Sequence, residues 1–557
     1  MRRQQRREQA IVGGALAVEP SFLWRNFATS GARAGEYELY VPFGAELGST
    51  RYGVYTFGPY TGGVMHLGRI KEGLPVVNKW HNDGTVTKTG TWTTTSNATA
   101  IPGPGSAAYS VAAGDTIQAT VTGHTLLLRG YTNVNGGFGL VALDGDYTAA
   151  TMLPAVSSSD FKAISGVAAG PGGVCRVTCT AHGFVTGATV LVENAGGVTG
   201  LNNLRHTITV VNANTFDCDG STFGGTYTSG GTAGYFAQAD LGRRIVNAYS
   251  IAISAFDEHF ALVEGLADGA HTITVRATGT AQAGGASGKR CYVVGFAAAS
   301  AGGRLSDANA GMGYLRDVVN YRASNGYSAL ASAIEFTPTG FSNYQFLGEV
   351  HGNEAQTALA WKVDGAAVSP AAGELSSGSV LRLERTSTLS HPSTGSTVAT
   401  KVAEYQAAAG QPDALRCAQT ITWSTAGTVR SGYHGMLPVG DHPRTTSTLR
   451  QTVFDRALVG AATVSSLAVD NDSQTSGGQA VRVEFYHATA HRLRARVTMP
   501  DPSKNVNGWT DPTASTFVQD RSDHIDKAYF ARSASGAEAV SVSSVHASET
   551  GWHVWRS

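Results

Sequence analysis

The chain has 557 residues, which is too long for a single hydrophobic core, so we expect several domains. Only 15% of the residues are charged, whereas 42% are hydrophobic and 69 are glycine, a composition typical of folded β proteins with many turns. The formal net charge is zero, so the chain has no global field that would attract nucleic acid or an anionic membrane.

Cysteine usage and hydropathy limit the compartment. The five cysteines are too few for a disulfide framework, and we expect synthesis in a reducing cytoplasm. No apolar run reaches the roughly 18 residues of a membrane helix, so no membrane insertion is expected. Four arginines precede a short apolar run at 11–18 that two glycines interrupt. We interpret this terminus as a basic segment that docks on a partner rather than as a signal peptide.

Residues 1–75 are dense in aromatic side chains, and the stretches 36–43 and 52–57 alternate like strands. Two interpretations stay open. The aromatic residues could form a small β core, or they could form an attachment surface, because aromatic residues and arginine are enriched at interfaces. We expect the segment to serve both purposes and to attach the protein to other proteins of a larger assembly.

A β-sandwich is predicted from two separated halves, at about 92–153 and 235–296. Each half has short strands with period-two alternation, such as 116–121 and 271–275, closed by Gly and Asp turns. Neither half has enough strands to bury two faces alone. We therefore predict one discontinuous sandwich, 76–162 plus 234–298, with residues 163–233 as an inserted module.

The inserted module carries several linked motifs. A strand at 176–180 leads into His182-Gly183-Phe184-Val185-Thr186-Gly187, then a Gly-rich turn ends in Leu201-Asn202, and the strand 207–211 precedes the sequence NANTFDCDG at 212–220. This order resembles a small β-barrel module of phage tail and virion proteins, and it is similar to a half-domain of ubiquitin-activating enzymes. The resemblance implies a structural or adhesive module without catalytic residues.

Residues 299–330 are predicted to be a connector with a short helix at 314–319, and residues 331–557 a second β-sandwich domain. Within this domain the stretches HGNE (351–354) and GYHGMLP (432–438) resemble the distal β-domains of phage tail-fibre and tail-tip proteins. No heptads are present, so no coiled-coil stalk is expected. The expected fold class is all-β, with several jelly-roll-like sandwiches and an inserted small β-barrel.

The spacing His351-x-x-Glu354 resembles the metal loop of zinc carboxypeptidases, in which a distant histidine completes the ligand set. By residue type, the available third ligands are His391, His434 and His442. Those enzymes need alternating helices, which residues 331–557 do not predict. We therefore favour a polar turn and expect no metal and no cofactor.

A sandwich of this kind also accompanies carbohydrate esterases, which need a serine after a Gly-Asp turn and an Asp-x-x-His pair. Here Thr116 follows Gly114-Asp115. No aspartate stands three residues before a histidine in the acidic cluster near the C-terminus, which comprises Asp520, Asp523, His524 and Asp526. We therefore expect no catalytic residue and a chain that is not an enzyme.

Three other clusters contain residue types that could bind a metal ion or an anion. Cys175 and Cys179 lie four residues apart on a predicted strand, about 13 Å, which is too far to share an ion. We interpret them, with His182 and Cys218, as buried packing residues, and His487 and His491 as surface histidines. The stripe of Arg492, Arg494 and Arg496 could meet an acidic glycan or a neighbouring subunit, but a solvated face is favoured.

The leading hypothesis from the sequence is a virion structural protein of a tailed phage, a tail fibre or tail tip. The resemblance implies a homotrimer that attaches to other tail proteins by its N-terminal segment and binds a host-surface glycan or protein. Two alternatives remain, a carbohydrate-active hydrolase or esterase and a purely architectural baseplate or head-decoration protein.

Overall fold

The structure is a computed structural model of the whole chain. It describes residues 22–26, 35–59, 63–96, 105–132, 135–145, 161–184, 186–187, 189–193, 195–202, 204–235, 244–247, 255–281, 289–305, 307, 310–320, 333–348, 351, 353–369, 375–408, 415–439, 454, 456–460, 462–464, 474–476, 480–486, 492–499, 515–519 and 526–556.

The protein is all-β, as the sequence predicts. Its strands pair in antiparallel fashion in every sheet. The described part of the chain contains one short 3-10 turn with full bounds, η1 (Pro171–Gly173). In this part of the chain no helix is long and apolar enough to cross a membrane.

A central sheet connects the two lobes of the molecule, a small sandwich built around the inserted segment and a large lobe that contains the C-terminal strands. Its strand order is β21-β9-β24-β4-β3-β2-β1-β30, and β25 also pairs with β4. The sheet therefore combines segments from the N-terminal, middle and C-terminal parts of the sequence. The bounds are β1 (Phe22–Asn26), β2 (Tyr37–Glu46), β3 (Ser49–Pro59), β4 (Met65–Trp80), β9 (Thr125–Thr132), β21 (Ala255–Val263), β24 (Gly295–Ala299), β25 (Ala310–Asn320) and β30 (Leu375–Gly378).

The small sandwich is built from strands on both sides of the inserted segment. Its outer sheet has the order β20-β10-β22-β8-β5, and a ribbon β23-β7-β6 lies beside it. Strand β22 pairs with β8 and β10, and β9 pairs with β21 and β24, so the halves before and after the insertion share one core. The bounds are β5 (Thr87–Thr89), β6 (Thr93–Ser96), β7 (Ser106–Ser110), β8 (Thr116–Gly123), β10 (Gly137–Leu143), β20 (Arg244–Asn247), β22 (Gly269–Ala281) and β23 (Cys291–Val293).

The inserted module has a hydrophobic core of its own, which draws on residues from Ile164 to Ala233. Its main sheet has the order β11-β19-β14-β16-β17-β13-β12, and β15 pairs with β18. Closure of this sheet into a barrel stays a prediction. The bounds are β11 (Phe161–Ala163), β12 (Gly166–Ala169), β13 (Cys175–Thr178), β14 (Thr189–Glu193), β15 (Gly196–Thr199), β16 (Leu204–Asn212), β17 (Thr215–Cys218), β18 (Gly224–Ser229) and β19 (Thr232–Tyr235).

The large lobe contains a long sheet, β29-β28-β31-β32-β33-β42-β39-β38-β35-β36, and a shorter one, β27-β26-β34-β41-β40-β37. The bounds are β26 (Ala333–Pro338), β27 (Gln345–Leu347), β28 (Glu354–Val363), β29 (Ala366–Val368), β31 (Val380–Ser390), β32 (Thr397–Ala408), β33 (Leu415–Trp423), β34 (Gly427–Val439), β35 (Arg456–Val459), β36 (Ala462–Val464), β37 (Gln474–Ser476), β38 (Arg482–Tyr486), β39 (Leu493–Thr498), β40 (Ser515–Gln519), β41 (Asp526–Val540) and β42 (Val545–Arg556).

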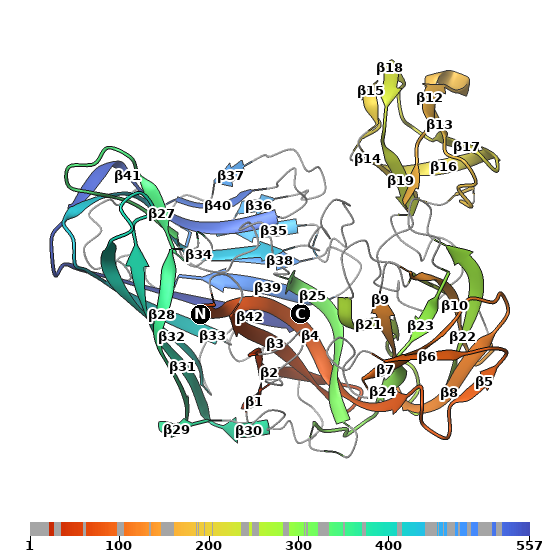
Figure 1. Ribbon diagram of the computed structural model, residues 1–557, viewed down its shortest axis with the longest axis horizontal. Coiled ribbons are helices and arrows are strands. Elements are labelled where there is room, and N and C mark those ends of the chain that lie inside the picture. The colour runs from red at the N-terminus through yellow and green to blue at the C-terminus, as the bar shows by residue number, and fades with distance from the viewer. Residues whose placement is uncertain are drawn as a thin grey trace.

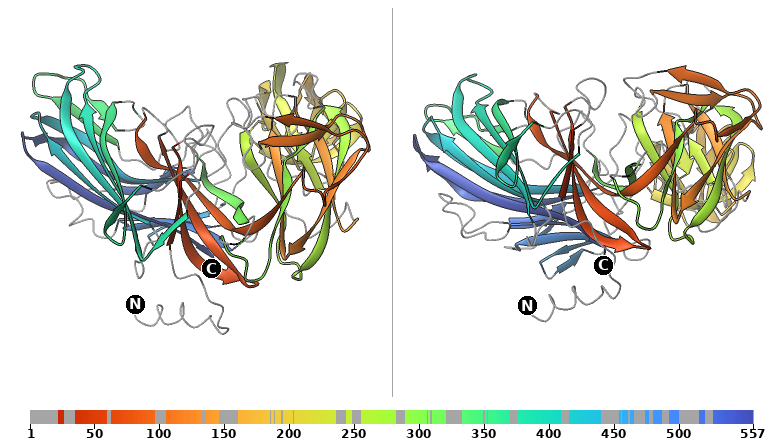
Figure 2. Two further views of the ribbon diagram at one scale, coloured as in Figure 1. Left: turned by 60° about the horizontal axis from the view of Figure 1, so that its bottom comes forward. Right: turned by 90° about the horizontal axis from the view of Figure 1, so that it is seen from below.

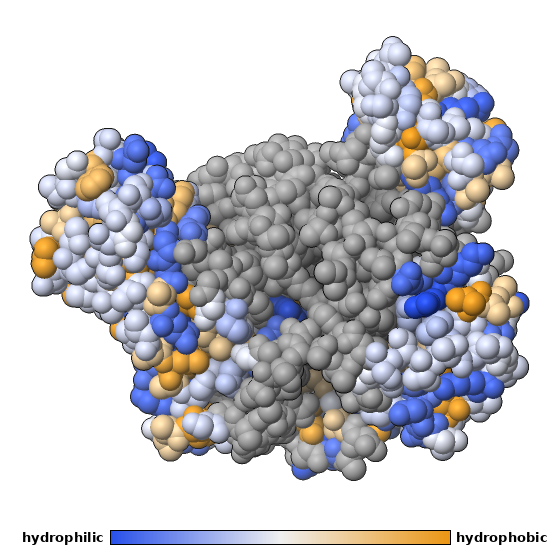
Figure 3. Space-filling view, in the orientation of Figure 1, coloured by the Kyte–Doolittle hydropathy of each residue, from blue (hydrophilic) through white to orange (hydrophobic). Residues whose placement is uncertain are grey.

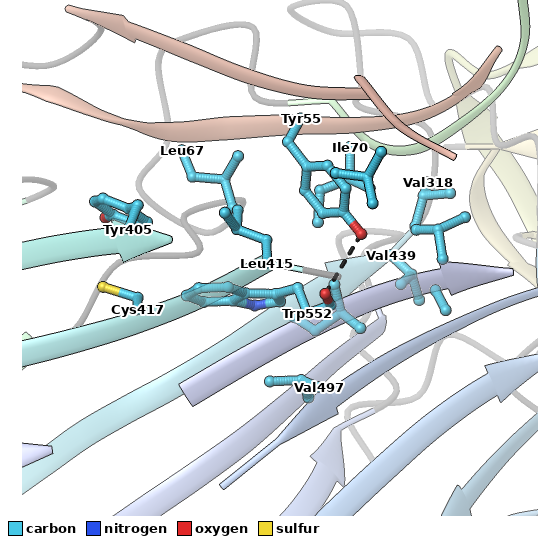
Figure 4. Close-up of a cluster of buried hydrophobic side chains, with 14 of the residues drawn as sticks. Tyr55, Leu67, Ile70, Val318, Tyr405, Leu415, Cys417, Val439, Val497 and Trp552 are labelled. Carbon is cyan, nitrogen blue, oxygen red and sulfur yellow. Dashed lines mark hydrogen bonds between the residues drawn. The ribbon is translucent and has the colours of Figure 1, made fainter. Parts of the chain in front are cut away.

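The principal core lies between the long sheet and strands β2–β4 (Figure 4). The hydroxyl of Tyr55 donates a hydrogen bond to the carbonyl oxygen of Trp552 (3.4 Å), and Phe57 meets Tyr405 edge to face with ring centroids 5.1 Å apart. On the other face of β2 and β3, Tyr40 is also fully buried. These N-terminal aromatic residues therefore form core, and they are not exposed for attachment to another protein.

Ion pairs join the two lobes where β42 ends. Glu72 on β4 is fully buried and accepts hydrogen bonds from Arg51 (3.0 Å) and Arg556 (2.7 Å). The Arg556 guanidinium also reaches Glu264 of the small sandwich at 3.2 Å. Breaking a buried ionic contact of this kind leaves an uncompensated charge, so loss of either arginine should destabilise the joint.

The helix predicted at 314–319 is wrong, because these residues belong to strand β25. The strand contains irregularities in its register at Tyr314/Arg316 and at Asp317/Val319. Each extra residue shifts the side-chain alternation, so the buried residues Met312, Leu315 and Val318 recur every third position. That spacing imitates the apolar stripe of a helix.

The two lobes lie at opposite ends of the view in Figure 1, with the large lobe on the left and the small sandwich on the right. The inserted module stands above the small sandwich, and the lobes diverge from the central strands in the views of Figure 2. Over the described part of the surface in Figure 3, hydrophilic and hydrophobic residues are interspersed.

Candidate functional site

The HGNE stretch connects β27 to β28, and its side chains have different surroundings. The His351 side chain is exposed, and its ring stacks on Phe346 with centroids 5.0 Å apart. Glu354 is buried, with its carboxylate 3.0 Å from Arg385 and 3.3 Å from Lys401, and it also accepts a hydrogen bond from Ser387 (2.5 Å). The carboxylate is thus held by cations of this chain.

A zinc site would need these two side chains to converge with a third ligand. His391 is fully buried beside Phe336, and His434 lies on β34, while His442 is outside the described residues. Within the described ranges, no group of three histidine, cysteine or acidic side chains could hold a metal ion. The polar-turn interpretation needs one correction, because Glu354 belongs to a buried ionic cluster rather than to a turn surface.

Among the described residues, two buried serine–histidine pairs most resemble a catalytic nucleophile with its general base. Ser49 Oγ lies 2.7 Å from His124 Nε2 and donates a hydrogen bond to the carbonyl oxygen of Ser300, and Ser106 Oγ lies 2.9 Å from His81. Ser49 and His124 are almost fully buried, so a substrate could not reach the hydroxyl. Of the C-terminal acidic cluster, Asp520, Asp523 and His524 lie outside the described residues, and Asp526 begins β41.

The cysteines and histidine of the inserted module are packing residues. Cys175 stands opposite Cys218 in the β13–β17 register, and both are buried and free. Burial raises the pKa of the Cys218 thiol, and the neighbouring Cys175 raises it further. His182 accepts the N–H of Phe184 (2.9 Å) at Nδ1, so its Nε2 donates to the carbonyl oxygen of Asn212 (3.0 Å). Both ring nitrogens are occupied, and His182 fixes the HGF turn.

The arginine stripe on β39 is largely committed to intramolecular contacts. Arg494 donates a hydrogen bond to the Glu484 carboxylate (2.5 Å). The Arg496 guanidinium lies over the Trp555 ring, and its Nη2 is 2.9 Å from Nδ1 of His553. Burial, and then the positive charge of Arg496, lowers the pKa of His553 to about 3. Arg492 is exposed, and His487 and His491 lie outside the described residues. An anion site on this stripe therefore has little support.

The strongest candidate site is an aromatic platform on the outer face of strands β26, β27 and β34. Phe346 also stacks with Tyr433, with centroids 6.0 Å apart and an interplanar angle of 27°. Arg430 binds Glu335 through two hydrogen bonds of 2.9 and 2.6 Å, and its guanidinium lies 4.7 Å from the ring centre of Tyr344. The platform is defined as Glu335, Tyr344, Phe346, His351, Arg430 and Tyr433.

Strand alternation places Glu335 and Phe346 on the face of the sheet away from the core. In β26, Ile334 and Phe336 point into the core, so Glu335 between them lies on the opposite face, opposite Phe346 in the β27 register. Burial raises the pKa of the Tyr433 hydroxyl, and the negative charge of Glu335 raises it further. The platform therefore places an exposed guanidinium and partly exposed aromatic rings over a buried carboxylate.

The loop that carries His351 is held by backbone and amide hydrogen bonds. The Asn353 side chain accepts the N–H of Gly348 (2.9 Å) and donates to the carbonyl oxygen of Phe346 (2.7 Å). Gly348 has φ of 138°, a conformation that favours glycine. Within the HGNE motif, His351 thus places a ring at the surface, Asn353 holds the loop, and Glu354 places a charge in the core.

His351 and the GYHGMLP stretch both stand out in the sequence, but the sequence does not show that they lie together. The one clue to their proximity is that both stretches resemble the distal domains of phage tail proteins. Tyr344, Phe346 and Arg430 could not be predicted as site residues, because lone aromatic and charged residues are common on strands.

No known family model matches the chain, and no curated protein matches it either.

Proposed function

We propose that the chain is a structural protein of a phage tail, a tail-fibre or tail-tip component that binds the host surface. The observation that carries the proposal is the inserted module. Its sequence motifs resemble a module of phage tail proteins, and residues 161–235 form a unit with its own core beside the small sandwich.

The aromatic platform supports a role in binding, because its His351 ring is exposed and stacks on Phe346. Attachment to other tail proteins is assigned to the N-terminal segment, whose residues 1–21 lie outside the described part of the chain.

Immunogold labelling tests the location. Antibodies raised against residues 161–235 should label the tails of virions from the phage that encodes the chain. Label on the head would favour the architectural alternative, and label that stays in the non-virion fraction of the lysate would overturn the proposal. Release of reducing sugar from host envelopes by the purified protein would favour the hydrolase alternative instead.

A further inference from the structure

We propose that the aromatic platform is a binding site for an uncharged oligosaccharide. The proposal rests on the proposed function for its biological setting, since it names the class of host-surface ligand. The binding itself can be measured without the virion, so the two can fail separately.

The rings supply the surface on which a sugar can stack. Near-parallel rings with centroids 5.0 and 6.0 Å apart are offset, and Phe346 and Tyr433 are half-buried rather than fully covered. His351 is the most exposed ring of the three. One face of a pyranose ring is formed by C–H groups, which pack on such aromatic faces, while its hydroxyl groups point outward around the rim.

The hydroxyl groups of a bound sugar need planar polar partners next to the rings. Arg430 uses Nε and Nη2 for Glu335, which leaves the Nη1 side of a half-exposed guanidinium as a hydrogen-bond donor. Glu335 is buried, and its two contacts orient the guanidinium, which lies over Tyr344. A fixed donor beside aromatic rings suits a sugar hydroxyl group, whose oxygen accepts a hydrogen bond.

The charges favour a neutral ligand. The bidentate contact between Arg430 and Glu335 balances the cation with an anion, so a sugar carboxylate or sulfate would approach both signs at once. The platform is also pre-ordered, because Asn353 and the β26–β27 pairing hold the loop and the rings before any ligand arrives. Little conformational entropy is then lost on binding.

The test is titration of the full-length protein with defined probes, monitored by saturation-transfer NMR and calorimetry. The neutral probes are cellohexaose, maltohexaose, chitohexaose and mannohexaose, and the acidic probe is hexagalacturonate. We expect saturable binding of at least one neutral probe, weakened at least about tenfold by His351→Ala and by Phe346→Ala. Phe341→Ala is the matched control, because Phe341 is a 54% exposed aromatic residue outside the platform, and it should bind as the unmodified protein does.

Each result decides a separate question. Absence of binding to every neutral probe, or binding that both platform variants retain, overturns the platform proposal even if the protein labels phage tails. Binding of hexagalacturonate in preference to the neutral probes overturns the assigned ligand class. Sugar binding that depends on His351, in a protein that is absent from virions, supports the platform and removes the tail assignment. Phe346 is partly buried, so the circular dichroism spectrum of Phe346→Ala must match that of the unmodified protein. If the spectra differ, the result for His351→Ala, on the exposed loop, decides the question.

Discussion

Neighbouring residues of one loop show how burial determines what a side chain does. His351 is exposed and stacks on a surface ring, Asn353 holds the loop, and Glu354 lies in the core with Arg385 and Lys401. A buried carboxylate is tolerated only where cations and hydrogen-bond donors compensate for its lost hydration. The hydroxyl of Ser387 completes that compensation for Glu354.

Removing the charge of Glu354 should therefore be costly. We expect Glu354→Gln to lower the free energy of unfolding by about 3–5 kcal/mol, because two cations lose a buried partner. From the sequence, a polar turn predicts a loss of only about 1–2 kcal/mol even when His351 and Glu354 are both changed to Ala. The control is Glu384→Gln on the same sheet, whose side chain is 28% exposed and should cost less than about 1 kcal/mol. Urea unfolding of both variants gives the comparison, and equal losses would contradict the buried cluster.

His81 should make the protein sensitive to acid. Burial lowers the pKa of His81 to about 4, with Lys88 adding to the effect and the hydrogen bond to Ser106 opposing it. In the unfolded chain His81 binds a proton near pH 6.5, whereas in the folded chain it stays neutral down to about pH 4. The free energy of unfolding therefore falls as the pH falls from 6.5 towards 4. The loss is about 3 kcal/mol at about 1.4 kcal/mol per pH unit. Urea unfolding from pH 7 to 4 should show a shallower decline for His81→Gln than for the unmodified protein.

His271 provides a contrast of opposite sign. Burial works against protonation, but the hydrogen bonds to Asp144 and to the carbonyl of Ala267 outweigh it and raise the pKa of His271. Its stabilising effect is present below its unfolded pKa and is lost as the pH rises through the folded pKa. His271→Gln should therefore lose stability mainly at low pH, and a decline parallel to that of His81→Gln would contradict both assignments.

At the scale of elements, the register decides which segments form a unit. Strands β2–β4 have both faces covered, because the long sheet packs on one face and Leu305 and Met312 on the other. Strand β30, far along the chain, pairs with β1 at the edge of the same sheet. The N-terminal strands therefore cannot be separated from the large lobe without exposing its core.

The inserted module should behave in the opposite way. Its core contains only residues of the module, so excised residues 161–235 should fold and unfold in one cooperative transition of their own. Replacing 161–235 by a short Gly-Ser linker should leave the melting temperature of the remaining protein within a few degrees. Circular dichroism and calorimetry of both proteins check this, and an unfolded excised module would contradict its independence.

At the scale of the whole molecule, one continuous sheet and the Arg556 contacts hold the lobes together. The platform lies in the large lobe, on strands at the end of the view away from the inserted module (Figure 1). The inserted module and the platform therefore lie on different parts of the molecule.

We expect the protein to form a homotrimer, as the phage fibres it resembles do. Symmetric assembly repeats each weak sugar site, so overall affinity rises without any new contact. Sedimentation velocity at micromolar concentration should give a mass of three chains. A stable monomer of 57.8 kDa would contradict the trimer while leaving the platform test unaffected.

The sequence alone determined the all-β class, because period-two alternation and Gly-Asp turns act locally. The 114–121 region shows this, since Gly114 has a positive φ and β8 then alternates as predicted. The same local reasoning failed at β25, where bulges changed the period. Bulges depend on the partner strand, and the sequence does not reveal that partner.

Only the tertiary structure decided which distant residues meet. Tyr433 reaches Phe346 because β34 pairs with β26 and β26 pairs with β27, and no single stretch encodes those pairings. It likewise placed Tyr55 and Phe57 in the core and Glu354 beside two cations. Strand pairing in a sheet depends on backbone groups that all residues share, so the sequence predicts the strands well and their neighbours poorly.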